Sequence, residues 1–285
     1  KDYDIIHIFS ASYFSFILAP TPAILISKLY GKKTILNYRS GEAPDHLKKW
    51  GWIVIPIIKM VDKIIVPSGF LVDVFNDFGL KADAVSNIVD FADFQFKKRE
   101  IVKPKLLVTR NLEKLYNISC AIRCFEIVKR EFPRAELVII GYGKDEANLK
   151  RLVRELNLND VRFTGRVERE AIPDYYDKAD IFLNSSDIDN MPVSFLEAFS
   201  AGLPVVSTDS GGIPYIVEDE YNGFLVKTGD YKALAERIIH LLKNQDQAQK
   251  LIQQAKEECK KYTWEYVKED WFRAYNSLVR DEAEN

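Results

Sequence analysis

Two acidic residues, Asp189 and Glu197, lie eight positions apart around the predicted start of a helix over 192–201. Pro192 suits the first turn of that helix, because its ring fixes φ and the N–H it lacks is not needed there. The free N–H groups of a helix start attract anions. Glu197 falls one to two turns further on, on the side of Val193. A nucleotide would fit, with its diphosphate at the amides and its ribose hydroxyls at the acid. The alternative is an ordinary βαβ turn whose glutamate faces solvent.

Two cations, Arg110 and Lys114, follow a buried strand predicted over 105–109. Ligands of doubly wound sheets bind outside the carboxyl ends of the strands, so these cations should lie near the helix start and could hold a diphosphate. An ordinary surface position is the alternative for both. Gly141-Tyr-Gly143 follows the next strand, and such a turn either lets the backbone approach a ligand or is only a turn.

Composition narrows the function classes. The chain has 285 residues, 47% of them hydrophobic, which is enough for two α/β domains. Its net charge of −2 gives no basic field for nucleic acid, so none is predicted as a partner. The three cysteines, Cys120, Cys124 and Cys259, are predicted to pack in the core rather than bind metal or form disulfides, which favours a reducing, cytoplasmic location.

Two apolar runs could concern a membrane. Residues 8–27 carry no charge, but two prolines and several hydroxyl residues favour a buried strand, loop and helix over a membrane span. Residues 50–60 are too short to span. They favour the buried face of a core helix, with Trp50, Trp52 and Lys48-Lys49 resting peripherally at the inner face of a membrane as the alternative.

Alternating strands and helices predict an α/β chain with two doubly wound, Rossmann-like domains. The first should cover 1–90. It opens directly on a strand at 4–9, so we expect its N-terminal part to be incomplete. A linker at 91–104 breaks the periodicity. A second domain follows over 105–262, and a last helix in 263–285 is expected to cross back to the first domain.

Several ordered segments resemble the retaining, nucleotide-sugar-dependent glycosyltransferases with two Rossmann-like domains (the GT-B fold). These are the glycosyltransferase family 4-like enzymes with a Glu-x7-Glu signature, which include glycogen-synthase-like enzymes and mannosyltransferases. The resemblance covers essentially the whole chain and is strongest over 105–228. It is carried by Asn87-Ile-Val-Asp90 with Phe94, Gly141-Tyr-Gly143, Val161-Arg-Phe-Thr-Gly165-Arg-Val167, Ala179-Asp-Ile-Phe-Leu-Asn-Ser185, Leu196-Glu197-Ala198, Ala201-Gly202-Leu-Pro204, Gly211-Gly212-Ile-Pro214 and Asn222-Gly223-Phe-Leu-Val226.

The resemblance implies a role for each matching position. Glu197 would hold the ribose hydroxyls, and Arg110 would bind the diphosphate. Arg166 and Val167 would meet the base through their backbone. The donor-binding set is completed by Gly141, Gly143, Asn190, Met191, Pro192 and Val193, and the catalytic set by Lys114 and Asp189. Family members of this type need no metal and no other cofactor.

The sequence departs from the family pattern at four of these places. Asp189 replaces the first glutamate of the signature and is shorter by one methylene, or roughly 1.5 Å. Pro192 stands where many members have glycine. Lys114 lies one or two positions before the usual lysine. Arg39 occupies the place of an active-site histidine and cannot serve as a base, although it could bind an acidic acceptor.

Two functions are therefore weighed. The first is transfer of a sugar from a UDP- or GDP-sugar to a glycan or lipid-linked acceptor, with retention of configuration. The second is a catalytically impaired sugar-nucleotide-binding protein, suggested by Arg39, Asp189 and the incomplete first domain. An epimerase or phosphorylase on the same architecture is a further alternative.

Overall fold

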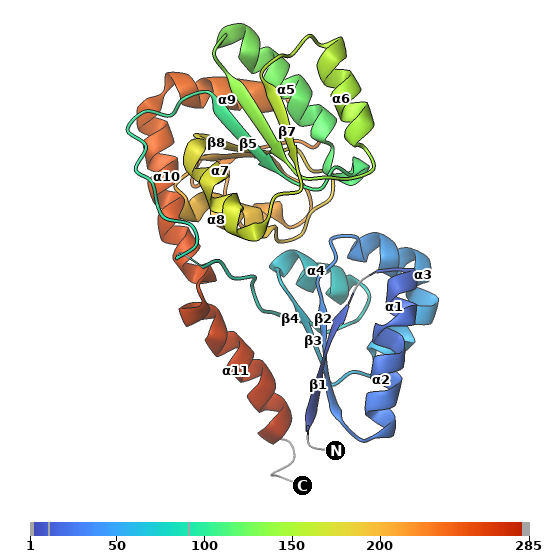
Figure 1. Ribbon diagram of the computed structural model, residues 1–285. Coiled ribbons are helices and arrows are strands. Elements are labelled where there is room, and N and C mark those ends of the chain that lie inside the picture. The colour runs from blue at the N-terminus through green and yellow to red at the C-terminus, as the bar shows by residue number, and fades with distance from the viewer. Residues whose placement is uncertain (1–2, 11, 91, 281–285) are drawn as a thin grey trace. The chain divides into compact units, whose positions relative to one another are not determined.

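A computed structural model describes residues 3–10, 12–90 and 92–280 (Figure 1). The chain divides into two compact units. One consists of Lys1–Asn87 with Trp264–Asn285, and the other of Ile88–Thr263. Each unit is built on a sheet of parallel strands covered by helices, which confirms the predicted fold class.

The first unit has four described strands in the simple order β1-β2-β3-β4, all parallel. Helices α1 to α4 pack on one face of this sheet, and α11 packs on the other (Figure 1). Alternation along the strands divides the core accordingly, because Leu36 faces the first layer and Ile35 faces α11. The elements are β1 (Ile5–Ser10), α1 (Phe14–Leu18), α2 (Pro20–Leu29), β2 (Lys33–Tyr38), α3 (Ala43–Ile58), β3 (Lys63–Val66), α4 (Gly69–Asp77), β4 (Asp83–Ala84) and α11 (Trp264–Arg280).

Two predicted elements of this unit differ from the structure. The apolar pattern of the sequence predicts a single helix over 13–29, but this segment is broken into α1 and α2 at Ala19, whose φ of −120° and ψ of −63° are not helical. Pro20 is the cause, because it lacks an N–H and disfavours the helical conformation of the residue before it. The sequence also predicts a strand over 82–87, of which the structure keeps only the two residues of β4.

The second unit has six described strands, all parallel, in the order β10-β9-β8-β5-β6-β7. The chain moves outward from β5 through β6 to β7 and then returns to the other side of β5 at β8. The strand order therefore reverses between β5 and β8, and such a reversal opens a crevice at the carboxyl ends of the strands. The strands are β5 (Lys105–Thr109), β6 (Glu136–Ile140), β7 (Val161–Gly165), β8 (Ile181–Asn184), β9 (Val205–Thr208) and β10 (Phe224–Val226).

Helices bury both faces of this second sheet. Leu106 and Val108 of β5 join the core beneath α5, α6 and α9, whereas Leu107 joins the core beneath α7 and α8. The three cysteines lie buried and unpaired in these two cores, which agrees with the predicted packing role. The helices are α5 (Ile118–Glu131), α6 (Glu146–Glu155), α7 (Ile172–Lys178), α8 (Val193–Ser200), α9 (Tyr231–Lys243) and α10 (Gln245–Cys259), with short 3-10 turns η1 (Lys114–Tyr116), η2 (Arg169–Ala171), η3 (Ile213–Tyr215) and η4 (Lys260–Tyr262).

The segment predicted as a linker, 91–104, lies within the second unit. Phe94 is buried in the core beneath α8, and Arg99 is buried with 3% of its surface exposed. The sequence of this segment is irregular because Phe94 and Arg99 pack against the second unit, and the segment is not a flexible linker. The boundary between the units falls instead between Asn87 and Ile88.

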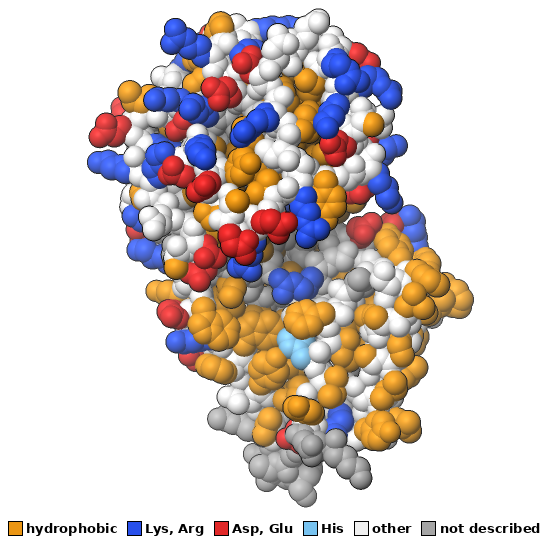
Figure 2. All heavy atoms as spheres, in the orientation of Figure 1, with side chains coloured by type: hydrophobic (Ala, Val, Ile, Leu, Met, Phe, Trp, Pro, Cys, Tyr) orange, Lys and Arg blue, Asp and Glu red, His pale blue; other side chains and the backbone are white. Residues whose placement is uncertain are grey.

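The surfaces of the two units differ in kind (Figure 2). On the viewed face, Lys and Arg alternate with Asp and Glu over the second unit, while hydrophobic side chains gather over the first. In α3, Leu47, Val54 and Ile58 are buried as predicted, but Trp52 is 80% exposed. Among the described residues, no helix has both the length and the apolar character needed to cross a bilayer.

Candidate functional site

Arg110 and Asp189 meet at the point where the strand order reverses. Arg110 directly follows β5, and Asp189 lies in the loop after β8, the neighbouring strand. The Arg110 guanidinium donates from Nη2 to Asp189 Oδ2 and, over 3.3 Å, from Nε to the side-chain oxygen of Asn184. The ring of Tyr116 lies 5.2 Å from the guanidinium carbon. Two loops far apart in sequence thus form one charged centre in the crevice.

This ion pair is largely withdrawn from solvent. The side chains of Arg110 and Asp189 keep 14% and 10% of their surface exposed. Burial raises the pKa of the Asp189 carboxyl, while the Arg110 charge and a 3.0 Å hydrogen bond from the Asn190 N–H act in the opposite direction. A charge buried in this way needs its partner, so Asp189 holds Arg110 in place as much as Arg110 holds Asp189.

Glycines allow the loops to close around this centre. A Cβ on Gly141 would lie 1.9 Å from the carbonyl oxygen of Arg110, and φ is +145° at this position. A Cβ on Gly211, at φ +52°, would lie 2.0 Å from the carbonyl oxygen of Asp189. Gly143 packs in the same way, with its Cβ position 2.3 Å from the Leu112 carbonyl oxygen. These glycines therefore set the positions of the loops that carry both charges.

Helix α8 points its N-terminus into the same crevice. Pro192 occupies the N-cap position with an extended backbone, and Val193 and Ser194 form the start of the helix. Their N–H groups are among those that a helix cannot satisfy internally. Ser194 is 8% exposed, and its Oγ finds no hydrogen-bond partner in the part of the chain that the structure describes. An anion at this helix end would meet both backbone donors and a hydroxyl.

Glu197, one turn further along α8, is held by a buried tyrosine. Tyr176 of α7 is fully buried, and its hydroxyl lies 2.7 Å from Glu197 Oε2 and 3.0 Å from Thr109 Oγ1. Burial raises the pKa of the Glu197 carboxyl, against the effects of the Tyr176 hydrogen bond and the charges of Arg110 and Arg169. The carboxylate is thus anchored on one side and open to the crevice on the other.

Arg110, Ser194 and Glu197 line one cavity of about 400 Å³, whose wall also contains Gly141 and Val193. At its rim the Arg166 guanidinium carbon lies 6.0 Å from the centre of the Tyr142 ring, and Val167 follows. A second cavity of about 390 Å³ begins on the other side of Glu197. The other lining residues of the first cavity are Thr109, Asn111, Tyr116, Ile140 and Ile172.

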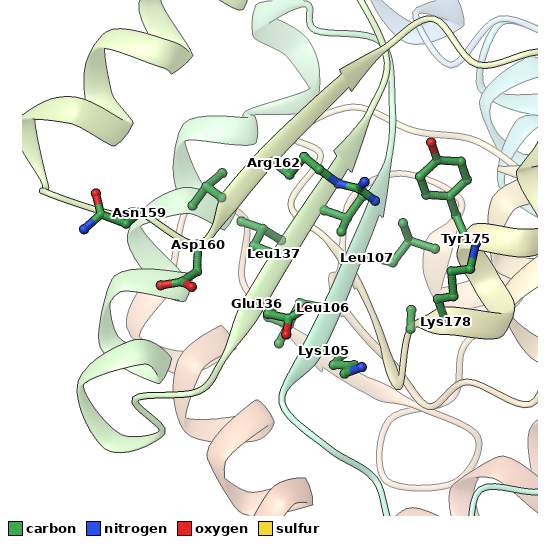
Figure 3. Close-up of a pocket in the computed structure, with 13 residues that line it drawn as sticks. Lys105, Leu106, Leu107, Glu136, Leu137, Asn159, Asp160, Arg162, Tyr175 and Lys178 are labelled. Atoms are coloured by element: carbon green, nitrogen blue, oxygen red, sulfur yellow. The ribbon is translucent and has the colours of Figure 1, made fainter.

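A somewhat larger cavity, of about 480 Å³, lies elsewhere in the second unit (Figure 3). It covers the first residues of β5, β6 and β7, where Lys105, Arg162 and Lys178 alternate with Glu136 and Asp160 (Figure 3). It is therefore at the amino ends of the strands, opposite the crevice, and its charges have both signs. Ligands of doubly wound sheets bind outside the carboxyl ends of the strands, so the smaller cavity is the candidate site.

The family described as "Glycosyl transferases group 1" matches residues 91–258, which include every residue of this cavity. The chain belongs to this family. Its curated relatives include the amylovoran biosynthesis glycosyltransferase AmsK of Erwinia amylovora, 36% identical over 157 residues (52% of this chain and 39% of AmsK). The poly(glycerol-phosphate) alpha-glucosyltransferase of Bacillus subtilis is 30% identical over 180 residues (62% of this chain and 26% of that protein). These matches span well under half the length of either relative.

Solved structures share the fold. Anabaena HepE, crystallised with UDP, superposes with a TM-score of 0.83 at 16% identity, over 97% of this chain and 79% of HepE. The pneumococcal O-GlcNAc transferase GtfA, in complex with UDP and GlcNAc, gives 0.76 at 15% identity, over 92% of this chain and 55% of GtfA. At such identities the likeness shows the two-domain glycosyltransferase fold alone.

Six of the thirteen predicted site residues line the cavity of about 400 Å³, namely Arg110, Gly141, Arg166, Val167, Val193 and Glu197, and seven do not. Among those seven, Asp189 pairs with Arg110, and Pro192 occupies the N-cap of α8. Lys114 lies on η1 with an exposed side chain, because that turn directs Tyr116 toward Arg110 instead. Gly143 supports the Leu112 backbone. Arg39 follows β2 in the first unit and donates to the side-chain oxygen of Asn87. Asn190 and Met191 are buried in the loop behind α8.

Two residues of the site were missed by sequence reasoning. Ser194 lines the cavity and Tyr176 donates to Glu197 from behind it, yet neither residue is charged. Ser194 lies two positions after Pro192, so its place in the first turn of the predicted helix was a usable signal. For Tyr176 no local signal existed, because tyrosines on amphipathic helices mostly serve packing.

Proposed function

We propose that this chain transfers a sugar from a UDP- or GDP-sugar to a glycan or lipid-linked acceptor, with retention of configuration. The observation that carries the proposal is the convergence, in one cavity, of the Arg110 cation, the start of α8 and the Glu197 carboxylate. The names of the relatives support it, since they include a glycosyltransferase of polysaccharide biosynthesis and a glucosyltransferase. Cytoplasmic location and peripheral membrane contact stay predictions.

The proposed reaction breaks the bond between the anomeric carbon of the donor sugar and the diphosphate oxygen. The acceptor hydroxyl oxygen forms the new glycosidic bond to the same carbon, and its proton passes to the departing diphosphate. Negative charge grows on that diphosphate as the bond breaks. Arg110, the amides at the start of α8 and the Ser194 hydroxyl would stabilise the growing charge more than the ground state, which accelerates the reaction.

Glu197→Gln tests the proposed nucleotide site. The variant keeps the shape of the side chain and removes the charge that would accept hydrogen bonds from ribose hydroxyls. Affinity should fall by about 1.5–3 kcal/mol, as for hydrogen bonds to charged groups. Calorimetry with UDP, GDP and ADP would measure this change and identify the base.

The matched control is Glu170→Gln, an exposed carboxylate of η2. It should leave the affinity unchanged. Wild-type affinity in Glu197→Gln would refute the ribose role. Tight nucleotide binding by the wild type, with no transfer from any nucleotide sugar in the full-length protein, would favour the sugar-nucleotide-binding protein instead.

Metal independence is part of the proposal, because Arg110 and the start of α8 offer the diphosphate a positive partner within the chain. Transfer rates should therefore be equal, within about twofold, in excess EDTA and in excess Mg²⁺. A rate that collapses in EDTA and returns with Mg²⁺ or Mn²⁺ would assign the charge neutralisation to a metal ion.

A further inference from the structure

Tyr176 forms the centre of a buried hydrogen-bonded chain behind the cavity. Its side chain has no solvent exposure, and its hydroxyl contacts three groups from two elements, β5 and α8. These are Thr109 Oγ1 of β5 at 3.0 Å, Glu197 Oε2 of α8 at 2.7 Å and the Ser194 carbonyl oxygen at 3.3 Å. The Tyr176 hydroxyl therefore links β5 to α8, the helix that carries Glu197, and it can set the position of the Glu197 carboxylate.

The direction of the hydrogen bonds follows from the number of protons. Tyr176 has one hydroxyl proton, and an ionised Glu197 can only accept. The proton therefore goes to Glu197 Oε2, the nearest acceptor and the only charged one among the three contacts. Since the Tyr176 proton is used, Thr109 must donate its own to the Tyr176 oxygen. The two hydrogen bonds therefore point in the same direction, from Thr109 to Tyr176 and from Tyr176 to Glu197.

We propose that Tyr176 is a positioning residue that fixes one oxygen of Glu197 and thereby presents the other to a pair of neighbouring ligand hydroxyls. The inference rests on the proposed function, in which those hydroxyls belong to a ribose. Oε2 is held by Tyr176, whereas Oε1 has no protein partner in the ranges that the structure covers. A carboxylate held at one oxygen cannot rotate away, so its free oxygen keeps one direction into the cavity.

The hydrogen bond also helps to keep Glu197 ionised. Burial favours the neutral acid, and Tyr176 is the first of the groups that oppose it. The other charged groups facing Glu197 come from the elements around it, and their signs are mixed. They are Arg110 after β5, Arg169 of η2, and Asp90 and Asp93 of the segment that enters the second unit.

Tyr176→Phe isolates the hydroxyl. The ring packs edge-on to Phe94 at 5.3 Å and stacks on Phe182 at 6.0 Å, and a phenylalanine can keep both contacts. Affinity for UDP, or for GDP if calorimetry favours it, should fall by roughly 10- to 100-fold at pH 7. The matched control is Tyr175→Phe. Tyr175 is half-buried, and its ring lies beside Arg162. It takes no part in the hydrogen bonds that link Thr109, Tyr176 and Glu197, so this variant should bind the nucleotide like the wild type.

A 2′,3′-dideoxynucleotide distinguishes positioning from general damage. The wild type should bind it more weakly than the natural nucleotide, whereas Tyr176→Phe should bind both about equally. In the variant the pKa of Glu197 is higher, so affinity for the natural nucleotide should be lost at a higher pH as the solution is acidified. Adding Tyr176→Phe to Glu197→Gln should cost little more, because the two residues act as one unit.

The possible outcomes separate the two proposals. If Tyr176→Phe keeps wild-type affinity, pH profile and discrimination between the nucleotides, the positioning role is overturned while the proposed function stands. If the wild type itself ignores the ribose hydroxyls, the role of Glu197 in the proposed function fails, and the inference fails with it. Should Tyr176→Phe not fold, Thr109→Val decides the matter. It removes only the first donor, so it must show a smaller loss of affinity and a smaller pH shift in the same direction.

Discussion

Arg110→Ala should lower kcat by about 10²- to 10³-fold, the usual cost of removing one group that stabilises developing charge. The affinity for the nucleotide sugar should fall much less, since the charge on the diphosphate grows only as the glycosidic bond breaks. Steady-state kinetics together with calorimetry separate the two effects. Arg123→Ala, an exposed arginine on α5, is the control and should leave both quantities unchanged.

The pairing with Asp189 makes a second variant necessary. Arg110→Ala leaves a buried carboxylate without its cation, which is strongly destabilising in itself. The double variant Arg110→Ala, Asp189→Asn removes both charges, so it should recover stability but not turnover. Recovery of turnover as well would show that the single variant fails through the stranded carboxylate. A single variant with wild-type kcat would remove Arg110 from the mechanism.

The sequence predicted the fold well because its signals are local. Buried parallel strands such as 105–109 and 136–140 read as continuous apolar runs, and both match their strands residue for residue. The failures are also local in cause. At Ala19 the following proline, Pro20, divides a helix although the apolar pattern continues through it. At 82–87 the strand pattern covers six residues, but β3 pairs with only Asp83 and Ala84.

The site was predicted less completely, since its contacts are made across the fold. Arg110 and Asp189 were each chosen from their own loops, but their pairing depends on strand order, which no local pattern fixes. Lys114 was chosen by charge and spacing, and the structure places its exposed side chain on η1, outside the lining of the cavity. Tyr176 has significance only because α7 brings it against Glu197.

Arg99 shows the same limit in the segment that was predicted as a linker. Its guanidinium ties together the C-terminal ends of the two helices that carry Tyr176 and Glu197. The Nε and Nη2 groups donate to the carbonyl oxygens of Ala179 and Tyr176 at 3.0 and 2.8 Å, at the end of α7. The Nη1 group donates to those of Ala201 and Gly202 at 2.6 and 3.0 Å, after α8. Carbonyl groups at helix ends lack internal partners and carry partial negative charge, so one buried cation satisfies both ends.

Arg99→Met should therefore destabilise the second unit by about 3–5 kcal/mol. The apolar side chain leaves the carbonyl oxygens of Tyr176, Ala179 and Gly202 without their donor and Asp180 without its cation, whereas the Ala201 oxygen still accepts from the Lys97 N–H. Lys98→Met, its exposed neighbour, is the matched control and should have little effect. All four tryptophans, 50, 52, 264 and 271, lie in the first unit. Their fluorescence therefore follows unfolding of the first unit, and the stability of the second unit needs another measurement. Amide hydrogen exchange should show lost protection in β8 and α8 of Arg99→Met while the first unit keeps its own. Equal protection in the two variants would mean that water satisfies these carbonyls and that Arg99 does not join α7 to α8.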